Sequence, residues 1–408
     1  MHPATPNSRM CLGQAVGRVV VAALVLCAGI VAQAQSFTET ILYNFTDTID
    51  GSTPSGLILD PQGNLYGTTP NGGPAFTACG NSGCGTVFRV TQNEKETNVY
   101  NFMGAPNDGQ DPLAGLIADK FGNGYGTTYL GGTNNVGTVY EITQSRKEAP
   151  IYSFAGMPDG SGPCSPLVMD SAGNLYGVTS GGGTSGRGTV YKLTNSRGGW
   201  KESVLYNFTV FSYSPNQYCA GLVVDSSGNL YGTTYENGAK TLGMIFKISP
   251  SGQETTLYSF QGPPDGAFPV AGLIRDSAGN LYGTTSEGGT GTKCGGVGCG
   301  TVFEFTSSGQ LKILHNFDST DGLLPEGTLL RDNSGNLFGP ALEGGSSLGG
   351  VIFAISAKGQ FGVLHNFSGS PDGYQPMQGL IRDSKGNLYG TTVEGGGFSS
   401  GTVFKLTP

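Results

Sequence analysis

Histidine, tryptophan and charged residues are scarce in this chain. Among 408 residues there are 3 His and 1 Trp, and only 12% of the residues are charged. With so few histidines, neither a Ser-His-Asp arrangement nor a histidine-rich metal centre can be assembled. Lys and Arg number 21 against 29 Asp and Glu, which gives a formal net charge of −8. Phosphate backbones require a basic surface, so we expect no nucleic-acid partner.

Long apolar runs are confined to the first residues. Arg9 and Arg18 precede an apolar stretch over residues 19–31, and Ala32-Gln33-Ala34 then has the small-x-small form of a cleavage site. We predict a signal peptide over residues 1–34 and an exported domain over residues 35–408, located outside the cell, at its surface or in the periplasm. No second apolar stretch follows, so we expect no membrane span after signal removal.

Glycine, in contrast, is abundant, with 71 residues, and much of it lies in a repeat. The motif G-N-L-Y-G-T-T occurs in seven copies, and its aromatic residue returns every 51 to 59 residues. A unit of this length with only short apolar runs cannot bury a core alone, so the units must pack on one another. The aromatic residues of the seven copies are Tyr66, Tyr125, Tyr176, Tyr231, Tyr282, Phe338 and Tyr389.

Each unit has the pattern of four short strands. In the third copy the runs cover residues 166–170, 175–179, 188–193 and 204–208, and each is rich in β-branched and aromatic residues and bounded by turn formers. The segment D-x-x-G-N between the first two runs predicts a tight hairpin, because Asp bonds its own downstream backbone and Gly accepts a positive φ. Four-stranded units repeated in this way are typical of a β-propeller.

The two ends of the exported domain complete one unit. Residues 41–45 copy the fourth strand, whereas residues 401–406 copy the third. We therefore predict an all-β, seven-bladed β-propeller, closed by pairing of the N-terminal strand with the last blade, which removes two exposed edges. The G-L-I-x-D strand should lie nearest the axis and the L-Y-N-F strand outermost, with its aromatic residues packed between blades. His315 and His365 replace Tyr in this outermost strand.

The string G-L-I-x-D-x-x-G-N-L-Y-G-T-T, followed by a G-G turn and G-T-V-F-K, resembles the GloVer tandem repeat of secreted bacterial proteins with a choice of surface anchors. The resemblance covers residues 38–408. Departures are local: Gly124 replaces Leu, Phe338 replaces Tyr, and Met244 and Val351 replace Thr. The resemblance implies an extracellular repeat protein and supplies no activity.

Six cysteines remain outside the predicted signal peptide. Cys79 with Cys84, and Cys294 with Cys299, flank four residues just before a third strand, so each pair is predicted to form a disulfide that pins a loop. A metal site is disfavoured because C-x4-C falls short of four ligands. Cys164 and Cys219 occupy the same phase of neighbouring units, where either a bridge between blades or two free thiols fits the sequence.

Carboxylates are the regularly placed reactive groups. An Asp-Gly step precedes the innermost strand in six units, a Glu follows the second strand in units four to seven, and strand order puts both sets on one rim. Turn formation explains these residues without a ligand. The alternative is that they bind sugar hydroxyls or Ca2+ at the mouth of the channel. The candidate ligand-binding residues are Asp50, Asp108, Asp159, Asp265, Asp321, Asp372, Glu236, Glu287, Glu343 and Glu394.

Two functions fit these features. The favoured hypothesis is an exported, monomeric, non-catalytic binding module that uses the loops of one rim to bind a polysaccharide, a cell-surface component or another protein. The other is a carbohydrate-active hydrolase or lyase that uses carboxylates at the channel mouth. We predict no catalytic residue, no metal ligand and no required cofactor, with Ca2+ as the one ion the loops would suit.

Overall fold

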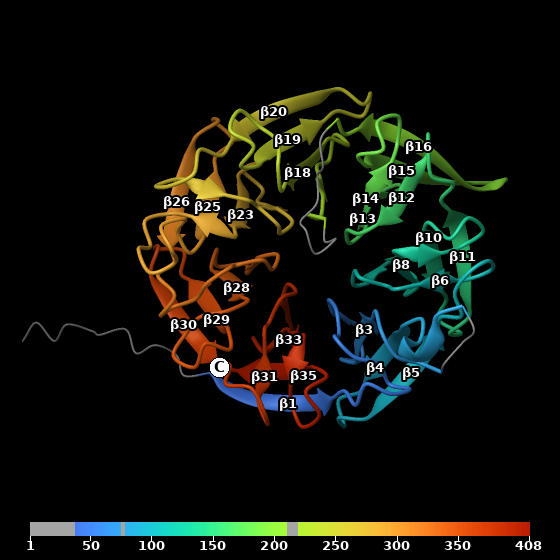
Figure 1. Ribbon diagram of the computed structural model, residues 1–408, viewed down its shortest axis with the longest axis horizontal. Coiled ribbons are helices and arrows are strands. Elements are labelled where there is room, and N and C mark those ends of the chain that lie inside the picture. The colour runs from blue at the N-terminus through green and yellow to red at the C-terminus, as the bar shows by residue number, and fades with distance from the viewer. Residues whose placement is uncertain (1–36, 75–77, 210–218) are drawn as a thin grey trace, which may run out of the picture. The chain divides into compact units, whose positions relative to one another are not determined.

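The computed structural model describes residues 37–74, 78–209 and 219–408, and Gln35–Pro408 forms one unit. The described residues form seven sheets of four main antiparallel strands, arranged as blades around an axis (Figure 1). The predicted seven-bladed β-propeller is confirmed. Within the described ranges the only helical segment is a 3-10 turn, η1 (Gly80–Ser82), and no helix there is long and apolar enough to cross a bilayer. The predicted signal peptide lies outside the described residues.

The inner two strands of each blade come from the G-L-I-x-D and L-Y-G-T-T segments. From blade 1 to blade 7 the innermost strands are β2 (Ile58–Leu59), β7 (Ile117–Ala118), β13 (Val168–Met169), β17 (Val223–Val224), β22 (Ile274–Arg275), β27 (Leu330–Arg331) and β32 (Ile381–Arg382). The second strands are β3 (Leu65–Thr69), β8 (Gly124–Thr128), β14 (Leu175–Gly182), β18 (Leu230–Thr234), β23 (Leu281–Thr285), β28 (Leu337–Ala341) and β33 (Leu388–Thr392).

The outer two strands come from the G-T-V-F-K and L-Y-N-F segments. In the same blade order the third strands are β4 (Thr86–Val90), β10 (Thr138–Ile142), β15 (Thr189–Ser196), β19 (Met244–Ile248), β25 (Thr301–Phe305), β29 (Val351–Ile355) and β35 (Thr402–Thr407). The outermost strands are β5 (Glu96–Asn101), β11 (Glu148–Ser153), β16 (Gly199–Asn207), β20 (Glu254–Ser259), β26 (Leu311–Asn316), β30 (Phe361–Asn366) and β1 (Thr38–Asn44).

The ring is closed by β1, which pairs antiparallel with β35 on the outside of blade 7 (Figure 1). Tyr43 lies opposite Val403, and Asn44 lies opposite Thr402. The register shifts at Leu42, and the corresponding shift occurs in the pairing of the third and outermost strands of the other six blades. The sheet completed by the two ends of the domain therefore has the same register as the continuous ones.

The hairpin between the two inner strands is built by its aspartate, as expected. Asp60 accepts hydrogen bonds from the amides of Gln62 and Asn64 and from the Asn64 side chain, at 2.7 to 2.9 Å. The same three bonds occur at all seven copies. These aspartates, which repeat without exception, satisfy backbone amides that the sharp turn would otherwise leave unpaired.

The Y-G-T-T motif has a packing reason. A Cβ built at Gly67 would lie 2.5 Å from the ring of Phe88 on the third strand, so only glycine leaves room for that ring. The second Thr of the motif shares a hydrogen bond with the Thr that begins the third strand, as between Thr69 and Thr86 at 2.8 Å. The bond recurs in blades 2, 3, 5 and 7, where both threonines are present.

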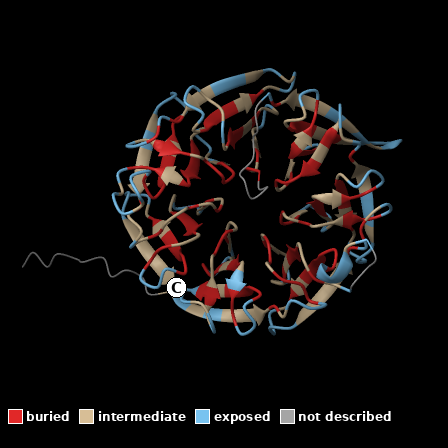
Figure 2. Cartoon of the chain, in the orientation of Figure 1, coloured by how far each residue is buried: buried red, intermediate tan, exposed pale blue. Residues whose placement is uncertain are grey.

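The core lies between neighbouring blades rather than within any one of them. The leucine that begins each second strand is at most 3% exposed wherever it occurs, and it packs against the preceding blade. The phenylalanine that follows each outermost strand is equally buried, and Figure 2 shows the buried residues inside the ring of blades. The apolar face of each blade is therefore covered only when the next blade packs on it.

Two rims follow from the strand directions. The loop rim is formed by the loops that follow the second and the outermost strands. The turn rim is formed by the D-x-x-G-N turns and by the turns between third and outermost strands. On the loop rim, short additional strands pair across the loops: β6 (Gly109–Gln110) with β9 (Leu130–Gly131), β12 (Gly160–Pro163) with β14, β21 (Gly266–Ala267) with β24 (Glu287–Gly288), and β31 (Gly373–Tyr374) with β34 (Glu394–Gly395).

Candidate functional site

The Asp-Gly aspartates hold the loop rim onto the outermost strands. Asp108 accepts hydrogen bonds from the Tyr100 hydroxyl at 2.8 Å and from the amides of Met103 and Gly109 at 2.7 and 2.6 Å, and it is only 2% exposed. Its carboxylate therefore closes the loop that leads from one blade to the next. The corresponding tyrosine-to-aspartate bonds are Tyr43 to Asp50, Tyr152 to Asp159 and Tyr258 to Asp265.

Histidine replaces tyrosine in two of these sets. His315 Nε2 lies 2.9 Å from Asp321, and His365 Nε2 lies 3.4 Å from Asp372. Both carboxylates also accept backbone amide hydrogen bonds, Asp321 from Asp318 and Asp372 from Gly373. All six predicted aspartates thus have partners inside the fold. The corresponding segment of the fourth unit, residues 214–216, lies outside the described residues.

The predicted glutamates lie beside the aspartates on the same rim. Glu287 pairs with Ala267, two residues after Asp265, and Glu394 pairs with Tyr374, two residues after Asp372. Glu343 forms a bridge with Leu323, and Glu236 is exposed. Burial raises the pKa of Glu287. Both candidate sets therefore meet on one face, as strand order implied.

Glu326 is a further carboxyl at the channel, and the sequence did not single it out. Together with Val270, Met377 and Cys164, it lines a small axial cavity of about 40 Å³. Burial, and then the neighbouring charge of Glu343, raise the pKa of Glu326 to about 7. At the corresponding position, six residues before the turn aspartate, the other blades carry only uncharged residues, namely Pro54, Leu113, Cys164, Cys219, Val270 and Met377. A charge in that otherwise apolar column is the signal that could have identified it.

Three disulfides are formed, of which two each close a loop and one joins two blades. Cys79–Cys84 and Cys294–Cys299 staple loops of the loop rim, as predicted. Cys164–Cys219 joins blade 3 to blade 4 at the axial cavity, with a Cα–Cα distance of 5.2 Å. Of the two alternatives left open for this last pair, the bridge between blades is the one formed. Three disulfides are consistent with an extracellular location.

Large apolar side chains are exposed mainly on the loop rim. Six of the seven such residues among those described lie in its loops, and the seventh, Phe121, lies on the turn rim. These six side chains come from six different loops, so the loop rim exposes more large apolar side chains than the turn rim does. The six, which are 50% to 67% exposed, are Ile49, Met103, Met157, Val297, Leu348 and Phe398.

A glutamate from the next blade approaches four of the aspartate sets at the outer edge of the ring. Each has an Oε1 atom that is buried without a hydrogen-bond partner. Burial, followed by the charge of the nearby aspartate, raises the pKa of these carboxyls to about 7 for Glu39, Glu96 and Glu202 and about 8 for Glu148. The partners are Asp372 for Glu39, Asp50 for Glu96, Asp108 for Glu148 and Asp159 for Glu202.

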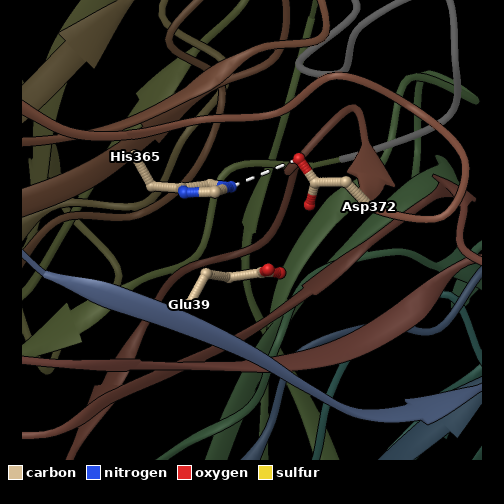
Figure 3. Close-up of side chains that lie close together, drawn as sticks. All are labelled: Glu39, His365 and Asp372. Atoms are coloured by element: carbon tan, nitrogen blue, oxygen red, sulfur yellow. Dashed lines mark ion pairs between the residues drawn. The ribbon is translucent and has the colours of Figure 1, made fainter.

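One of these sets contains histidine. Glu39 on β1, His365 on β30 and Asp372 converge, with one potential ligand atom from each within 4.8 Å of the others (Figure 3). It is the one group of this kind among the described residues. One nitrogen and two oxygens would be an incomplete donor set for a structural zinc ion, which takes four ligands. The tyrosine-containing sets occupy the same place in other blades, so this group is a variant of a repeated structural contact.

The closed ring and its repeated sheets define the chain as a seven-bladed β-propeller built from tandem repeats. The profile of the Gloeobacter/Verrucomicrobia repeat matches residues 28–223, 75–297 and 218–408. The chain belongs to this repeat family, which confirms the resemblance seen in the sequence. No functionally curated protein matches the chain.

Solved structures share the fold at low sequence identity. Virginiamycin B lyase from Staphylococcus aureus is 16% identical with a TM-score of 0.55, over 91% of this chain and 99% of that protein. The extracellular domain of a putative hybrid two-component system from B. thetaiotaomicron is 13% identical with a TM-score of 0.55, over 90% of this chain and 39% of that one. At these identities the likeness shows the fold alone.

Proposed function

We propose that this protein is an exported, monomeric, non-catalytic binding module that contacts an extracellular macromolecule through its loop rim. The observation that carries the proposal is that six of the seven exposed large apolar side chains among the described residues lie on that rim. Polysaccharides, cell-surface components and other proteins are the candidate targets. Exposed Met and Phe side chains favour a protein surface among them, because interfaces are enriched in Met and aromatic residues.

The loops that carry these side chains are held in place. Val297 lies inside the loop closed by Cys294–Cys299, and Met103 follows Phe102 directly beside the Asp108 hydrogen bonds. A surface held in one conformation loses less entropy on binding. Because the six Asp-Gly carboxylates have partners inside the fold, they support the proposal as organisers of the rim. Glu236 and Glu394, which are exposed, remain the candidates for direct contact with sugar hydroxyls or Ca2+.

The test compares substitutions on the two rims. Labelled protein would be titrated onto intact bacterial envelopes and onto a glycan array, with and without a chelator. A variant with Met103, Met157 and Phe398 changed to Ser should bind at least about tenfold more weakly, whereas Phe121→Ser on the opposite rim should bind as the wild type does. Equal binding by both variants would contradict the proposal. Loss of binding on chelation alone would assign the contact to a cation instead.

A catalytic role has one observation in its favour. Glu326 has a raised pKa beside a second carboxyl, Glu343, which is the pattern of a general acid paired with a base. The axial cavity of about 40 Å³ has room for little more than one water molecule, which argues against a bound sugar at that point. If any hydrolase or lyase activity on a polysaccharide were found, Glu326→Gln should abolish it. Unchanged turnover in that variant would remove this pair from consideration.

A further inference from the structure

A cleft on the turn rim lies between blades 1 and 2, on the side opposite the loops discussed above. It has a volume of about 530 Å³, within the range of small-molecule sites. Its floor includes Val87, Leu116 and Ile142, and its mouth is formed by the two D-x-x-G-N turns and by the turn that ends at Arg146. The cleft is lined entirely by residues that the structure describes.

The cleft exists because one leucine of the repeat is missing. In six blades the second strand begins with a leucine that is buried against the preceding blade, with an exposed fraction of 0% to 3%. In blade 2 this position is Gly124, so no side chain fills the corresponding space against blade 1. The six leucines are Leu65, Leu175, Leu230, Leu281, Leu337 and Leu388.

Gly124 is not required by the backbone. Its φ angle is not positive, and a Cβ placed there would meet its nearest atoms, in Ile142 and Leu116, at 3.9 Å, which is ordinary contact. This differs from Gly126 in the same strand, where a Cβ would lie 2.4 Å from the Tyr140 hydroxyl. The backbone conformation and the packing around residue 124 therefore do not require glycine, and its effect is to leave a space between the blades.

Other departures from the repeat add positive charge and an aromatic ring at the same cleft. Lys120 and Phe121 occupy the D-x-x-G-N turn of blade 2, where the other turns carry mostly Ser, Ala, Pro or Asn. Phe121 is 65% exposed, and the Lys120 ammonium lies 5.1 Å from its ring centroid. Arg89, at the position of the Lys in G-T-V-F-K, and Arg146 supply two more cations to the lining. Three cations at one cleft stand out in a chain with a net charge of −8.

One buried hydrogen-bond donor of the cleft lacks a partner, and one tyrosine hydroxyl differs from its counterparts in other blades. The Nε atom of Arg89 is buried without an acceptor among the described residues. Tyr66 makes no bond to Asp60, although the five other tyrosines at this position each donate to the aspartate of their own turn. A buried donor without an acceptor costs free energy unless a ligand or water satisfies it. Asp60, which accepts three hydrogen bonds within its own turn, is the one carboxylate among the lining residues.

We propose that this cleft binds a small organic carboxylate with an apolar, preferably aromatic, body. The Arg89 guanidinium, the Lys120 ammonium and the Tyr66 hydroxyl would receive the carboxylate, since carboxylate oxygens accept hydrogen bonds from all three groups. The apolar body would occupy the space that the leucine fills in other blades, and Phe121 would stack on it at the entrance. This site is independent of the loop-rim function.

The probe is 1-naphthoate, compared with neutral 1-naphthalenemethanol, titrated by calorimetry into the protein over residues 35–408. We expect the wild type to bind 1-naphthoate with Kd near or below about 1 mM, and the neutral analogue at least about fivefold more weakly. Gly124→Leu should weaken binding at least about tenfold, because it fills the cleft while restoring the residue of the repeat. Its melting temperature should not fall, so loss of binding cannot be attributed to misfolding.

Charge variants provide the second arm. Arg89→Gln should weaken naphthoate binding at least about fivefold, because the charge-assisted hydrogen bonds are lost. Lys385→Ser removes a cation from the same kind of turn in blade 7 and should leave binding unchanged. The proposal would be overturned by absence of naphthoate binding to the wild type at millimolar concentration, by equal affinity for the neutral analogue, or by undiminished binding to Gly124→Leu. If Gly124→Leu folds poorly, Gly124→Ala should weaken binding by a smaller factor.

Discussion

The interface between blades 1 and 2 and the interface between blades 2 and 3 are made of the same motifs, yet one is open and the other closed. Between blades 2 and 3, Leu175 packs with Val139, Phe154 and Leu193 and is fully buried. Between blades 1 and 2, Gly124 stands in its place beside a cleft of about 530 Å³. In six blades the leucine at this position is buried against the preceding blade. Blade 2 lacks this buried side chain and has an open space instead.

The largest effect should come from opening a closed interface. Leu175→Gly would copy blade 2 into blade 3, removing a fully buried side chain and adding backbone freedom in a strand. We expect the free energy of unfolding to fall by about 3–5 kcal/mol. Denaturant titration followed by tyrosine fluorescence would measure this loss. A loss below about 1 kcal/mol would mean that the buried leucine of the second strand contributes little to stability, and would contradict the contrast between the closed and the open interface.

The disulfides offer the next comparison, between a bridge that joins two blades and a bridge within one loop. Cys164–Cys219 closes 55 residues and Cys79–Cys84 closes 5. Chain entropy gives about 4 kcal/mol for the first and about 2 kcal/mol for the second. Unfolding of the two double Cys→Ala variants should therefore differ by about 2 kcal/mol. The opposite order would indicate that the bridge at the axis adds nothing to the ring.

The outer-edge glutamates distinguish blades by pH. Glu39, Glu96, Glu148 and Glu202 have pKa values raised to about 7 or 8, so the folded state holds these protons more tightly than the unfolded chain does. Their contribution to stability is complete below about pH 4 and is lost as the pH rises through 7 to 8. We expect the melting temperature to fall between pH 5 and pH 8.5, within the usual titration range of such groups.

Glu148→Gln should make that decline shallower, because the variant keeps the shape and loses the titration. The matched control is Glu254→Gln, because the unit before it carries Ser214-Pro215-Asn216 in place of the Asp-Gly step. A melting temperature that is flat or rising over this range, in the wild type, would contradict the assignment of these raised pKa values.

The smallest effect concerns the threonine pair between the second and third strands. In blade 4, Met244 faces Thr234, and the Thr234 hydroxyl is buried without a partner. Thr234→Val should remove this unpartnered hydroxyl at nearly unchanged volume and stabilise the fold by about 1 kcal/mol. In blade 6, Ala341 faces Val351, so Val351→Thr should bury a lone hydroxyl and destabilise instead. Thermal unfolding of both variants tests the contrast, and shifts of the same sign would refute it.

The propeller fold was predictable because it depends on a pattern that repeats along the sequence. The contacts within a site depend instead on which side chains lie next to one another in the folded structure. The period, the phase of the two ends and the spacing of Cys79 and Cys84 were enough to predict the ring, its closure and the loop disulfides. The bond from Tyr100 to Asp108 could not be read from the sequence, because it depends on the register shift in the outermost strand.

The departures from the repeat were visible, but their consequences were not. In the sequence, Gly124 stood out as a missing leucine. The sequence does not show whether neighbouring side chains fill the space, because that depends on how the two blades pack. Glu326 was hidden because it belongs to neither regular set of carboxylates, the Asp-Gly steps or the glutamates that follow the second strands. In both places a single blade breaks the symmetry.

The most direct test of this account is the free energy of unfolding of Gly124→Leu relative to the wild type. If the position is a space left open in an otherwise continuous apolar column, the variant should be more stable by about 1.5–3 kcal/mol, the value of burying one leucine side chain. A variant that is less stable than the wild type would show that the space is already filled, and would contradict the account of blade 2.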